Sequence, residues 1–192
     1  GYGRNHFPLS DEAVSEIACH AAGVAFSFPD AGVLIDIGGQ DSKVIRMSPG
    51  GKVLDFGMND RCAAGTGRFI EMVSDILDIR LEDISKMSFR KVSGCEINSM
   101  CAVFAESEIV GLLQNDEPVE KLLKGVFVSV AKRVVSLMGR SFSSKEIVFT
   151  GGVALINGVA EALEQETGSR IIVPASPQIT GALGAAIIAG KR

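Results

Sequence analysis

Short apolar segments alternate with helical patterns along this chain, and two of these segments run directly into a pair of glycines. Residues 33–35 lead into residues 36–41 (DIGGQD), and residues 147–149 lead into residues 150–154 (TGGVA). A short apolar run bounded by turn residues predicts a buried strand. Because strands that alternate with helices are typical of α/β folds, the sequence predicts an α/β protein.

The remaining patterns complete this arrangement. Residues 43–47 and 52–56 flank a Ser-Pro-Gly-Gly turn and predict a hairpin. Residues 11–26 have helical spacing, with Asp11 as the predicted N-cap. Apolar spacing predicts further helices over residues 69–77, 101–113, 119–138 and 158–168, a strand over residues 170–173, and a closing helix of small residues over residues 181–189.

The first glycine loop has the features of a phosphate-binding turn. Gly38 and Gly39 let the backbone approach an anion closely, and their N–H groups can hold phosphate oxygens. A carboxylate at a strand end, here Asp36, can hold Mg²⁺ through water in a nucleotide site. An ordinary strand-to-turn connection is the alternative. The sequence has no Walker A motif and no G-x-G-x-x-G that opens a βαβ unit, which disfavours P-loop and Rossmann folds.

The second glycine loop contains Gly151 and Gly152 and, like the first, follows a predicted strand; a helix start with Asn157 nearby comes next. This loop could hold a flat base or a ribose against its backbone, or it could be an ordinary tight connection. Two loops of one kind in the same chain favour a nucleotide site more than either loop does alone.

Cys62 and Cys101 each stand just before a helical pattern. Unpaired N–H groups and the helix dipole favour an anionic group there, and thiolates are good metal ligands. Two cysteines cannot complete a four-cysteine cluster, but a twofold dimer supplies four. The alternative is that both are small buried residues, as most free cysteines are. Their separation along the chain is too large for a zinc finger.

The other cysteines and the two histidines are weaker candidates. Cys19 fits a buried position in the first helix, and Cys95 is an improbable ligand in a polar segment. His6 and His20 are interpreted as surface or hydrogen-bonded core histidines. Four cysteines in a chain without a signal peptide indicate thiols or ligands instead of a disulfide framework.

Charge and hydropathy exclude several classes of protein. The 192 residues suffice for one domain, or two small lobes, with a hydrophobic core. A net charge of −4 without a basic run argues against nucleic acid as a partner. No apolar stretch approaches the roughly 20 residues that a membrane span needs. The absence of a signal peptide predicts a cytoplasmic location.

Together these motifs closely resemble those of the activators of 2-hydroxyacyl-CoA dehydratases, which belong to the BadF/BadG/BcrA/BcrD family of ATPases. The resemblance rests on both glycine loops and on two cysteine segments, residues 59–69 (NDRCAAGTGRF) and 101–108 (CAVFAESE), and it covers essentially the whole chain. It implies an α/β fold of the actin-like, sugar-kinase-like (ribonuclease H-like) class, with ATP or ADP and Mg²⁺ in a cleft.

The resemblance also implies roles for particular residues. Asp36 and Gln40 match catalytic positions. Cys62 and Cys101 of each subunit match the ligands of one [4Fe–4S] cluster that bridges a homodimer. The residues implied to contact the nucleotide and its metal are Asp36, Gly38, Gly39, Gln40, Asp41, Gly151, Gly152, Val153 and Asn157.

The implied function is ATP-dependent electron transfer. Members of the family take an electron from ferredoxin or flavodoxin. They pass it to a 2-hydroxyacyl-CoA dehydratase component, or to a related component in systems of the benzoyl-CoA reductase type. Movement of the helices beside the cysteines on nucleotide binding would change the potential of the cluster.

One feature of the family is missing from this sequence. Family members begin with an Asp-x-Gly-Ser phosphate loop, which this chain lacks. We therefore expect residues 1–32 to be a remnant of the first lobe, residues 33–179 to be the second lobe, and residues 180–192 to be a closing helix. Because a phosphoryl-transfer site is built from both sides of its cleft, this chain alone is expected to bind nucleotide weakly and to hydrolyse it poorly.

Two other functions fit parts of the sequence. A small-molecule kinase of the same fold would use the glycine loops but not the two cysteine segments. A non-enzymatic dimeric redox module would use the cysteines to hold a cluster or zinc. The sequence does not identify the acyl-CoA pathway.

Overall fold

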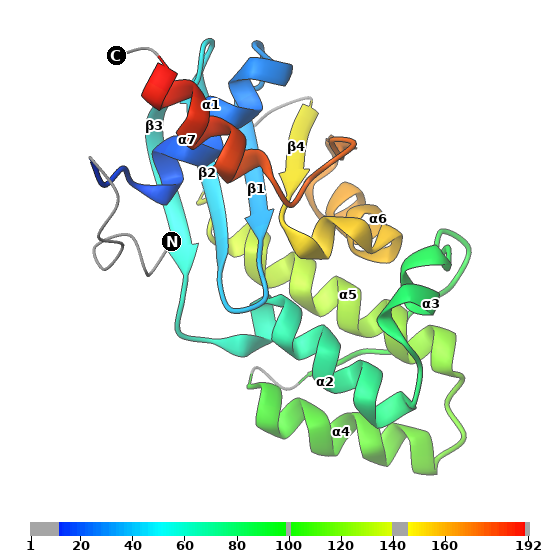
Figure 1. Cartoon of the computed structure of the whole chain (residues 1–192). Helices are drawn as coiled ribbons and strands as arrows, with labels where there is room; N and C mark the ends of the chain where they lie inside the picture. Colours follow the sequence, from blue (N-terminus) through cyan, green and yellow to red (C-terminus); the bar gives the residue numbers. More distant parts are fainter. Residues whose placement is uncertain (1–11, 99–100, 140–145, 191–192) are drawn as a thin grey trace.

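In the computed structural model, which describes residues 12–98, 101–139 and 146–190, five strands form one sheet in the order β3-β2-β1-β4-β5 (Figure 1). The hairpin of β2 (Ser42–Ser48) and β3 (Lys52–Asn59) is antiparallel, and β2 is also antiparallel to β1 (Val33–Ile37). On its other side β1 pairs in parallel with β4 (Glu146–Thr150), and β4 pairs in parallel with β5 (Arg170–Ile172). The predicted α/β class and the predicted hairpin are confirmed.

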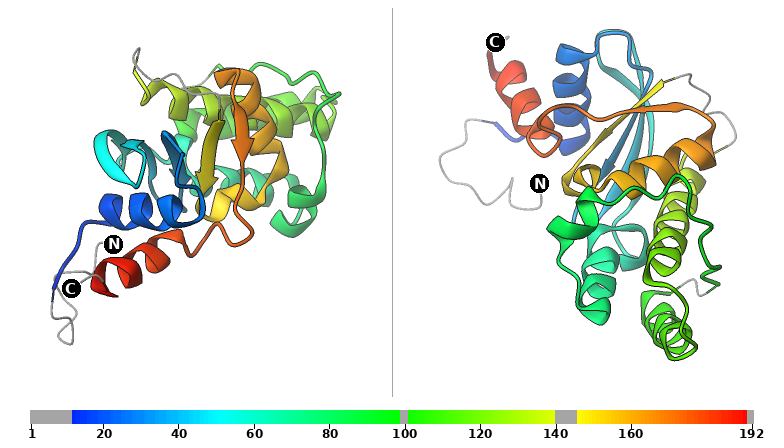
Figure 2. Two further views of the ribbon diagram at one scale, coloured as in Figure 1. Left: turned by 90° about the horizontal axis from the view of Figure 1, so that it is seen from above. Right: turned by 90° about the vertical axis from the view of Figure 1, so that its right-hand side faces the viewer.

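Two helices cover one face of the sheet. α1 (Glu16–Ser27) and α7 (Thr180–Gly190) lie side by side there, blue and red in Figure 2. Gly184 of α7, one of the small residues of the predicted closing helix, lies directly against the backbone of Cys19 in α1. The smaller core beneath these helices consists of Ala21, Val24, Leu34, Ile45, Met47 and Val148.

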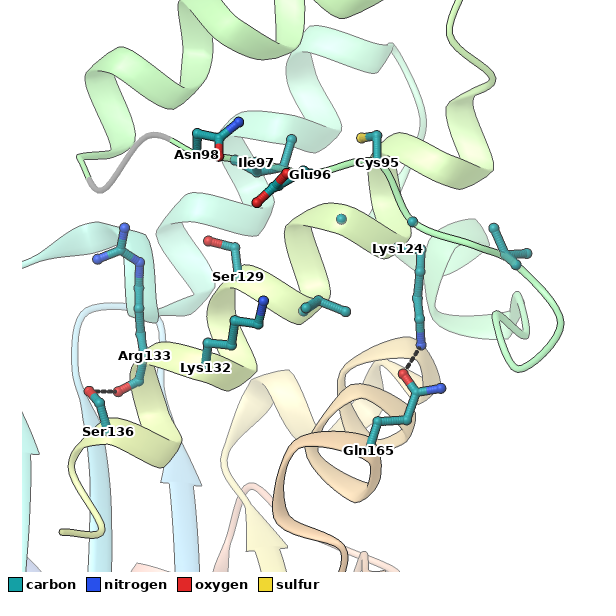
Figure 3. A pocket seen from close by; sticks show the side chains of 14 residues that line it. Cys95, Glu96, Ile97, Asn98, Lys124, Ser129, Lys132, Arg133, Ser136 and Gln165 are labelled. Carbon is teal, nitrogen blue, oxygen red and sulfur yellow. Dashed lines mark hydrogen bonds between the residues drawn. The ribbon is translucent and has the colours of Figure 1, made fainter. Parts of the chain in front are cut away.

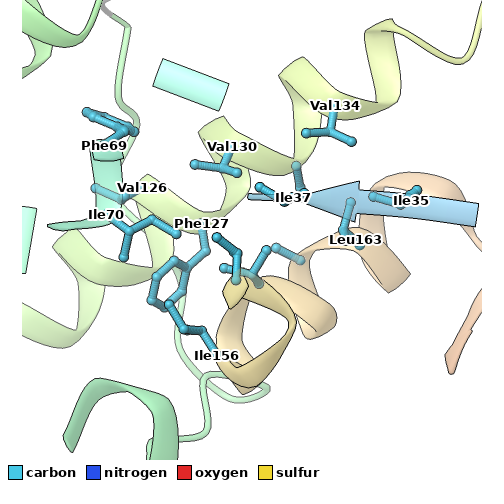
Figure 4. Close-up of a cluster of buried hydrophobic side chains, with 14 of the residues drawn as sticks. Ile35, Ile37, Phe69, Ile70, Val126, Phe127, Val130, Val134, Ile156 and Leu163 are labelled. Atoms are coloured by element: carbon cyan, nitrogen blue, oxygen red, sulfur yellow. The ribbon is translucent and has the colours of Figure 1, made fainter. Parts of the chain in front are cut away.

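The larger core fills the opposite face, between the sheet and α2 (Gly67–Leu77), α5 (Val119–Ser136) and α6 (Asn157–Thr167) (Figure 4). Ile35 and Ile37 point into this core, while their neighbour Leu34 points into the smaller one. β1 is therefore buried on both faces, which is why its sequence is an apolar run without alternation.

Two helices lie outside these layers. α4 (Ala102–Gln114) packs against α2 and α5 and buries Ala105 and Ile109. α3 (Leu81–Lys86) packs against α6 and buries Ile84. The sequence patterns did not predict α3, because six residues are too few to show a helical period.

The first helix begins later than the sequence predicted. It starts at Glu16, because Ser15 is extended and its side chain accepts a hydrogen bond from the backbone N–H of Ala18 at 3.2 Å. The proposed cap Asp11 lies outside the described residues. Within the described residues, no helix is both long enough and apolar enough to cross a membrane.

Candidate functional site

The two glycine loops lie next to each other. They follow neighbouring parallel strands, with Asp36 opposite Thr150 in the register. Gly151 has a φ of 90°, and a Cβ atom there would collide with the carbonyl group of Ile37. Only glycine lets the second loop approach β1 this closely. In open α/β sheets, ligands bind at this kind of edge, where parallel strands end.

The start of α2 forms a third wall at this edge. The backbone N–H of Gly67 donates to the carbonyl of Gly38 at 2.8 Å, and that of Arg68 donates to the carbonyl of Gly39 at 2.9 Å. The N–H of Gly38 donates to the carbonyl of Asp41 at 2.9 Å, which closes the turn. A Cβ atom on Gly39 would meet nothing within 4 Å, so the tip of the loop is open to a ligand.

The predicted catalytic residues occupy different surroundings. Gln40 is exposed at the tip of the first loop, whereas Asp36 is buried at 3% exposure. The Thr150 hydroxyl donates to Asp36 Oδ1 at 2.8 Å. Asp36 is thus fixed in position, and Gln40 is free to meet a ligand.

A buried lysine lies among the carboxylates beside this loop. Lys43 Nζ lies 2.9 Å from Asp41 Oδ2, 3.1 Å from Glu16 Oε1 and 3.7 Å from Asp36 Oδ2. Burial disfavours the charged form of Lys43, but the hydrogen bond to Asp41 and the charges of Asp36 and Glu16 outweigh burial and raise its pKa. Burial likewise disfavours the Glu16 carboxylate, but Lys43 outweighs it and lowers the pKa of Glu16.

α1 and α7 reach the same cluster through His20. Its Nδ1 atom lies 3.5 Å from Asp36 Oδ1 and 3.2 Å from Thr180 Oγ1. His20 is buried, so its interpretation as a hydrogen-bonded core histidine is confirmed. Sequence reasoning missed Lys43, Glu16, Thr150 and Thr180. No signal in β2 singles out Lys43, because this strand also contains Arg46 and two serines.

Asp36 and Asp41 fit Mg²⁺ in donor type. Mg²⁺ is usually held by one or two carboxylates together with substrate phosphates and water. Among the described residues, no group of three or more His, Cys, Asp or Glu side chains could hold a metal ion by itself. The two aspartates therefore fit a metal that arrives with a nucleotide better than a resident ion.

The second loop offers mainly backbone atoms to a ligand. Gly152 begins a 3₁₀ turn (Gly152–Leu155), and Asn157 is exposed at the start of α6. Val153 is buried at 4% exposure, and its side chain belongs to the larger core. Val153 can thus contribute backbone groups to a ligand site while its side chain supports the core.

Cys62 follows β3 and is held by Asn59. The Asn59 side chain accepts from the Cys62 N–H at 3.1 Å and donates to the Cys62 carbonyl at 2.8 Å. Cys62 is half-buried and precedes a 3₁₀ turn (Ala63–Gly65) that leads into α2. It also lines a cavity of about 230 Å³ together with Arg133.

Cys101 is exposed and is the N-cap of α4, which packs beside α2. The predicted position just before a helix is confirmed for Cys101, whereas the 3₁₀ turn separates Cys62 from α2. The described chain contains Cys19, Cys62, Cys95 and Cys101 as free thiols, as predicted. Cys62 and Cys101 together fit half of a site with four thiolate ligands.

A larger cavity, of about 630 Å³, lies between residues 92–98 and α5 (Figure 3). Lys124 in its wall donates to Gln165 Oε1 at 2.7 Å. Burial and the charge of Glu117 raise the pKa of the Cys95 thiol, which disfavours the thiolate that binds metals. None of the predicted site residues lines this cavity.

Known proteins resemble the chain in sequence and in structure. Residues 1–189 match the BadF/BadG/BcrA/BcrD ATPase family. The chain is 43% identical over 189 residues to the 2-hydroxyisocaproyl-CoA dehydratase activator of Clostridioides difficile, covering 98% of this chain and 71% of that protein. It is 42% identical over 193 residues to the (R)-2-hydroxyglutaryl-CoA dehydratase activating ATPase of Acidaminococcus fermentans, covering 100% of this chain and 74% of that protein.

A solved structure is also similar to this chain: the activator of the 2-hydroxyisocaproyl-CoA dehydratase from Clostridium difficile with bound ADPNP. Its TM-score is 0.94 at 43% identity, and the match covers 100% of this chain and 71% of that one. The α/β, actin-like ATPase fold that the resemblance implied is confirmed. The family match over residues 1–189, together with the identity to these relatives, shows that the chain belongs to the BadF/BadG/BcrA/BcrD ATPase family.

Proposed function

We propose that this chain is an ATP-dependent electron-transfer activator. It binds a nucleotide with Mg²⁺ at its two glycine loops and shares one [4Fe–4S] cluster with a second copy of itself. Relatives named as activators of 2-hydroxyacyl-CoA dehydratases support this function. The observation that carries it is the hydrogen bonding between the first glycine loop and α2, the helix that follows Cys62.

At the nucleotide site, the backbone of both loops would hold the ligand. Gly38, Gly39 and Asp41 would surround the phosphates, and Gly151, Gly152, Val153 and Asn157 would contact the nucleoside. The exposed Gln40 would orient the attacking water, whereas the buried Asp36 would act on a metal through water. A bound Mg²⁺ would neutralise charge on the phosphates.

At the cluster, the two cysteines of one chain would supply half of the ligands. A bound cluster would supply one-electron transfer. Asn59 fixes the backbone of Cys62 through two hydrogen bonds, and the exposed position of Cys101 suits contact with a second subunit. α2 joins this site to the nucleotide loop, so that a shift of the loop moves the helix beside Cys62.

The partners follow from the proposed function. Ferredoxin or flavodoxin would donate the electron, and a 2-hydroxyacyl-CoA dehydratase component, or a related component of the benzoyl-CoA reductase type, would accept it. Residues 33–179 would form the second lobe, residues 1–32 a remnant of the first lobe, and residues 180–192 a closing helix.

Metal analysis tests the proposal. The chain is purified without oxygen, and iron, acid-labile sulfide and zinc are measured per dimer. We expect about four irons and four sulfides, as a four-cysteine cluster requires. Cys62→Ala should abolish both, whereas Cys19→Ala, which changes a buried cysteine of α1, should keep both. Zinc alone, or iron retained by Cys62→Ala, would contradict the cluster assignment.

A further inference from the structure

Lys43 is almost completely buried, although its ammonium group is charged. Its side chain is 2% exposed, and it comes from β2, next to the first glycine loop. Asp41, Glu16 and Asp36 surround the ammonium group at 2.9, 3.1 and 3.7 Å. Buried charges persist only when they are paired, so these contacts hold the lysine in place.

The three carboxylates come from different parts of the fold. Asp36 ends β1, Asp41 closes the turn that contains Gly38 and Gly39, and Glu16 belongs to α1. A single ammonium group therefore joins both ends of the glycine loop to a helix that covers one face of the sheet. Without it, the carboxylates would repel one another and would also repel a phosphate group at the loop.

We propose that Lys43 is a positioning residue of the nucleotide site, an inference that rests on the proposed function. Lys43 fixes the distance between the Asp36 and Asp41 carboxylates, and it supplies the positive charge that lets a phosphate approach the loop before any metal is bound. Because its ammonium group is buried among these carboxylates, Lys43 acts on the ligand through them and not by direct contact.

The proposal predicts a specific link between Lys43 and Mg²⁺. A divalent cation bound with the nucleotide can replace part of the charge that Lys43 supplies. Loss of Lys43 should therefore weaken nucleotide binding more in the absence of Mg²⁺ than in its presence. A purely structural loss of folded protein would reduce both affinities in the same proportion.

Calorimetric titration of the full chain with β,γ-imido-ATP, in excess Mg²⁺ and in EDTA, tests this link. The measured quantity is the ratio of the two dissociation constants, EDTA over Mg²⁺. We expect Lys43→Met to raise this ratio by about tenfold, because one nearby unit charge is removed. The control Lys52→Met, which changes an exposed lysine of the neighbouring strand β3, should leave the ratio unchanged.

A second variant keeps the test decisive if Lys43→Met does not fold. Glu16→Gln removes one carboxylate from Lys43 and leaves the other two, so the ratio should fall below that of the wild type. An unchanged ratio in a folded Lys43→Met variant would overturn the proposal, as would an unchanged ratio in Glu16→Gln. Absence of binding by the wild-type chain in both buffers would instead overturn the proposed nucleotide site itself, and this inference with it.

Discussion

The backbone N–H of Gly67 donates to the carbonyl oxygen of Gly38 at 2.8 Å, so the helix that follows Cys62 begins on the first glycine loop. The next residue, Arg68, repeats the contact to Gly39 at 2.9 Å. These two hydrogen bonds connect the loop directly to the start of α2. A displacement of the loop must therefore move α2, and a displacement of α2 must move the loop.

This contact predicts the effect of a methyl group at Gly67. A Cβ atom there would lie 3.1 Å from the Gly38 carbonyl oxygen and 3.2 Å from Gly39 Cα, so Gly67→Ala should displace the loop. We expect nucleotide affinity, measured by calorimetry, to fall by about tenfold, because small misplacements of binding groups are costly. Gly111→Ala, in an open position of α4, should leave the affinity unchanged.

The close approach of the second loop to β1 predicts a large loss of stability in Gly151→Ala. Its φ of 90° is unfavourable for alanine, and the new Cβ atom would collide with the backbone of Ile37. Gly168→Ala isolates the effect of the positive φ, because a Cβ atom on Gly168, whose φ is 65°, would meet nothing within 4 Å. Denaturant unfolding should show that Gly168→Ala lowers the free energy of unfolding by about 1–2 kcal/mol. Gly151→Ala should lower it clearly more, and equal decreases in the two variants would contradict the collision with Ile37.

Glu161 is a buried carboxylate that holds the segment after α3. It accepts hydrogen bonds from the Phe89 N–H and the Ser88 hydroxyl, each at 2.9 Å. Glu161→Ala leaves the Phe89 N–H without its partner, so we expect a loss of about 1–3 kcal/mol in the free energy of unfolding. Glu166→Ala, at an exposed position of the same helix, should change it by less than about 0.5 kcal/mol.

Lys124 predicts a rise of stability with pH. Burial disfavours its charged form and lowers its pKa, despite the favourable charge of Glu161. Between this lowered pKa and the ordinary value of 10.5, the unfolded chain binds more protons, so the free energy of unfolding rises with pH. As the pH falls through the lowered pKa, that stability is lost. In unfolding experiments across this pH range, the free energy of unfolding should rise less with pH in Lys124→Met than in the wild type. In Lys121→Met, which changes an exposed lysine of α5, the rise should equal that of the wild type.

The features that could be predicted from the sequence are those set by neighbouring residues. A strand end followed by a glycine pair occupies a few consecutive positions, so the sequence predicts the loops at residues 36–41 and 150–154. The sequence does not predict the buried cluster around Lys43, because its members come together only when the sheet forms. Thr180 lies 160 residues from its partner His20. The same limit applies to the side chain of Val153, whose burial in the larger core depends on contacts between distant segments.

The most direct test is the midpoint potential of the cluster in anaerobic protein with β,γ-imido-ATP and with ADP. If the glycine loop and α2 connect the nucleotide to Cys62, the two potentials should differ. Gly67→Ala should reduce the difference, while Gly111→Ala should retain it. Identical potentials and identical spectra with both nucleotides would contradict the coupling of nucleotide binding to electron transfer in this chain.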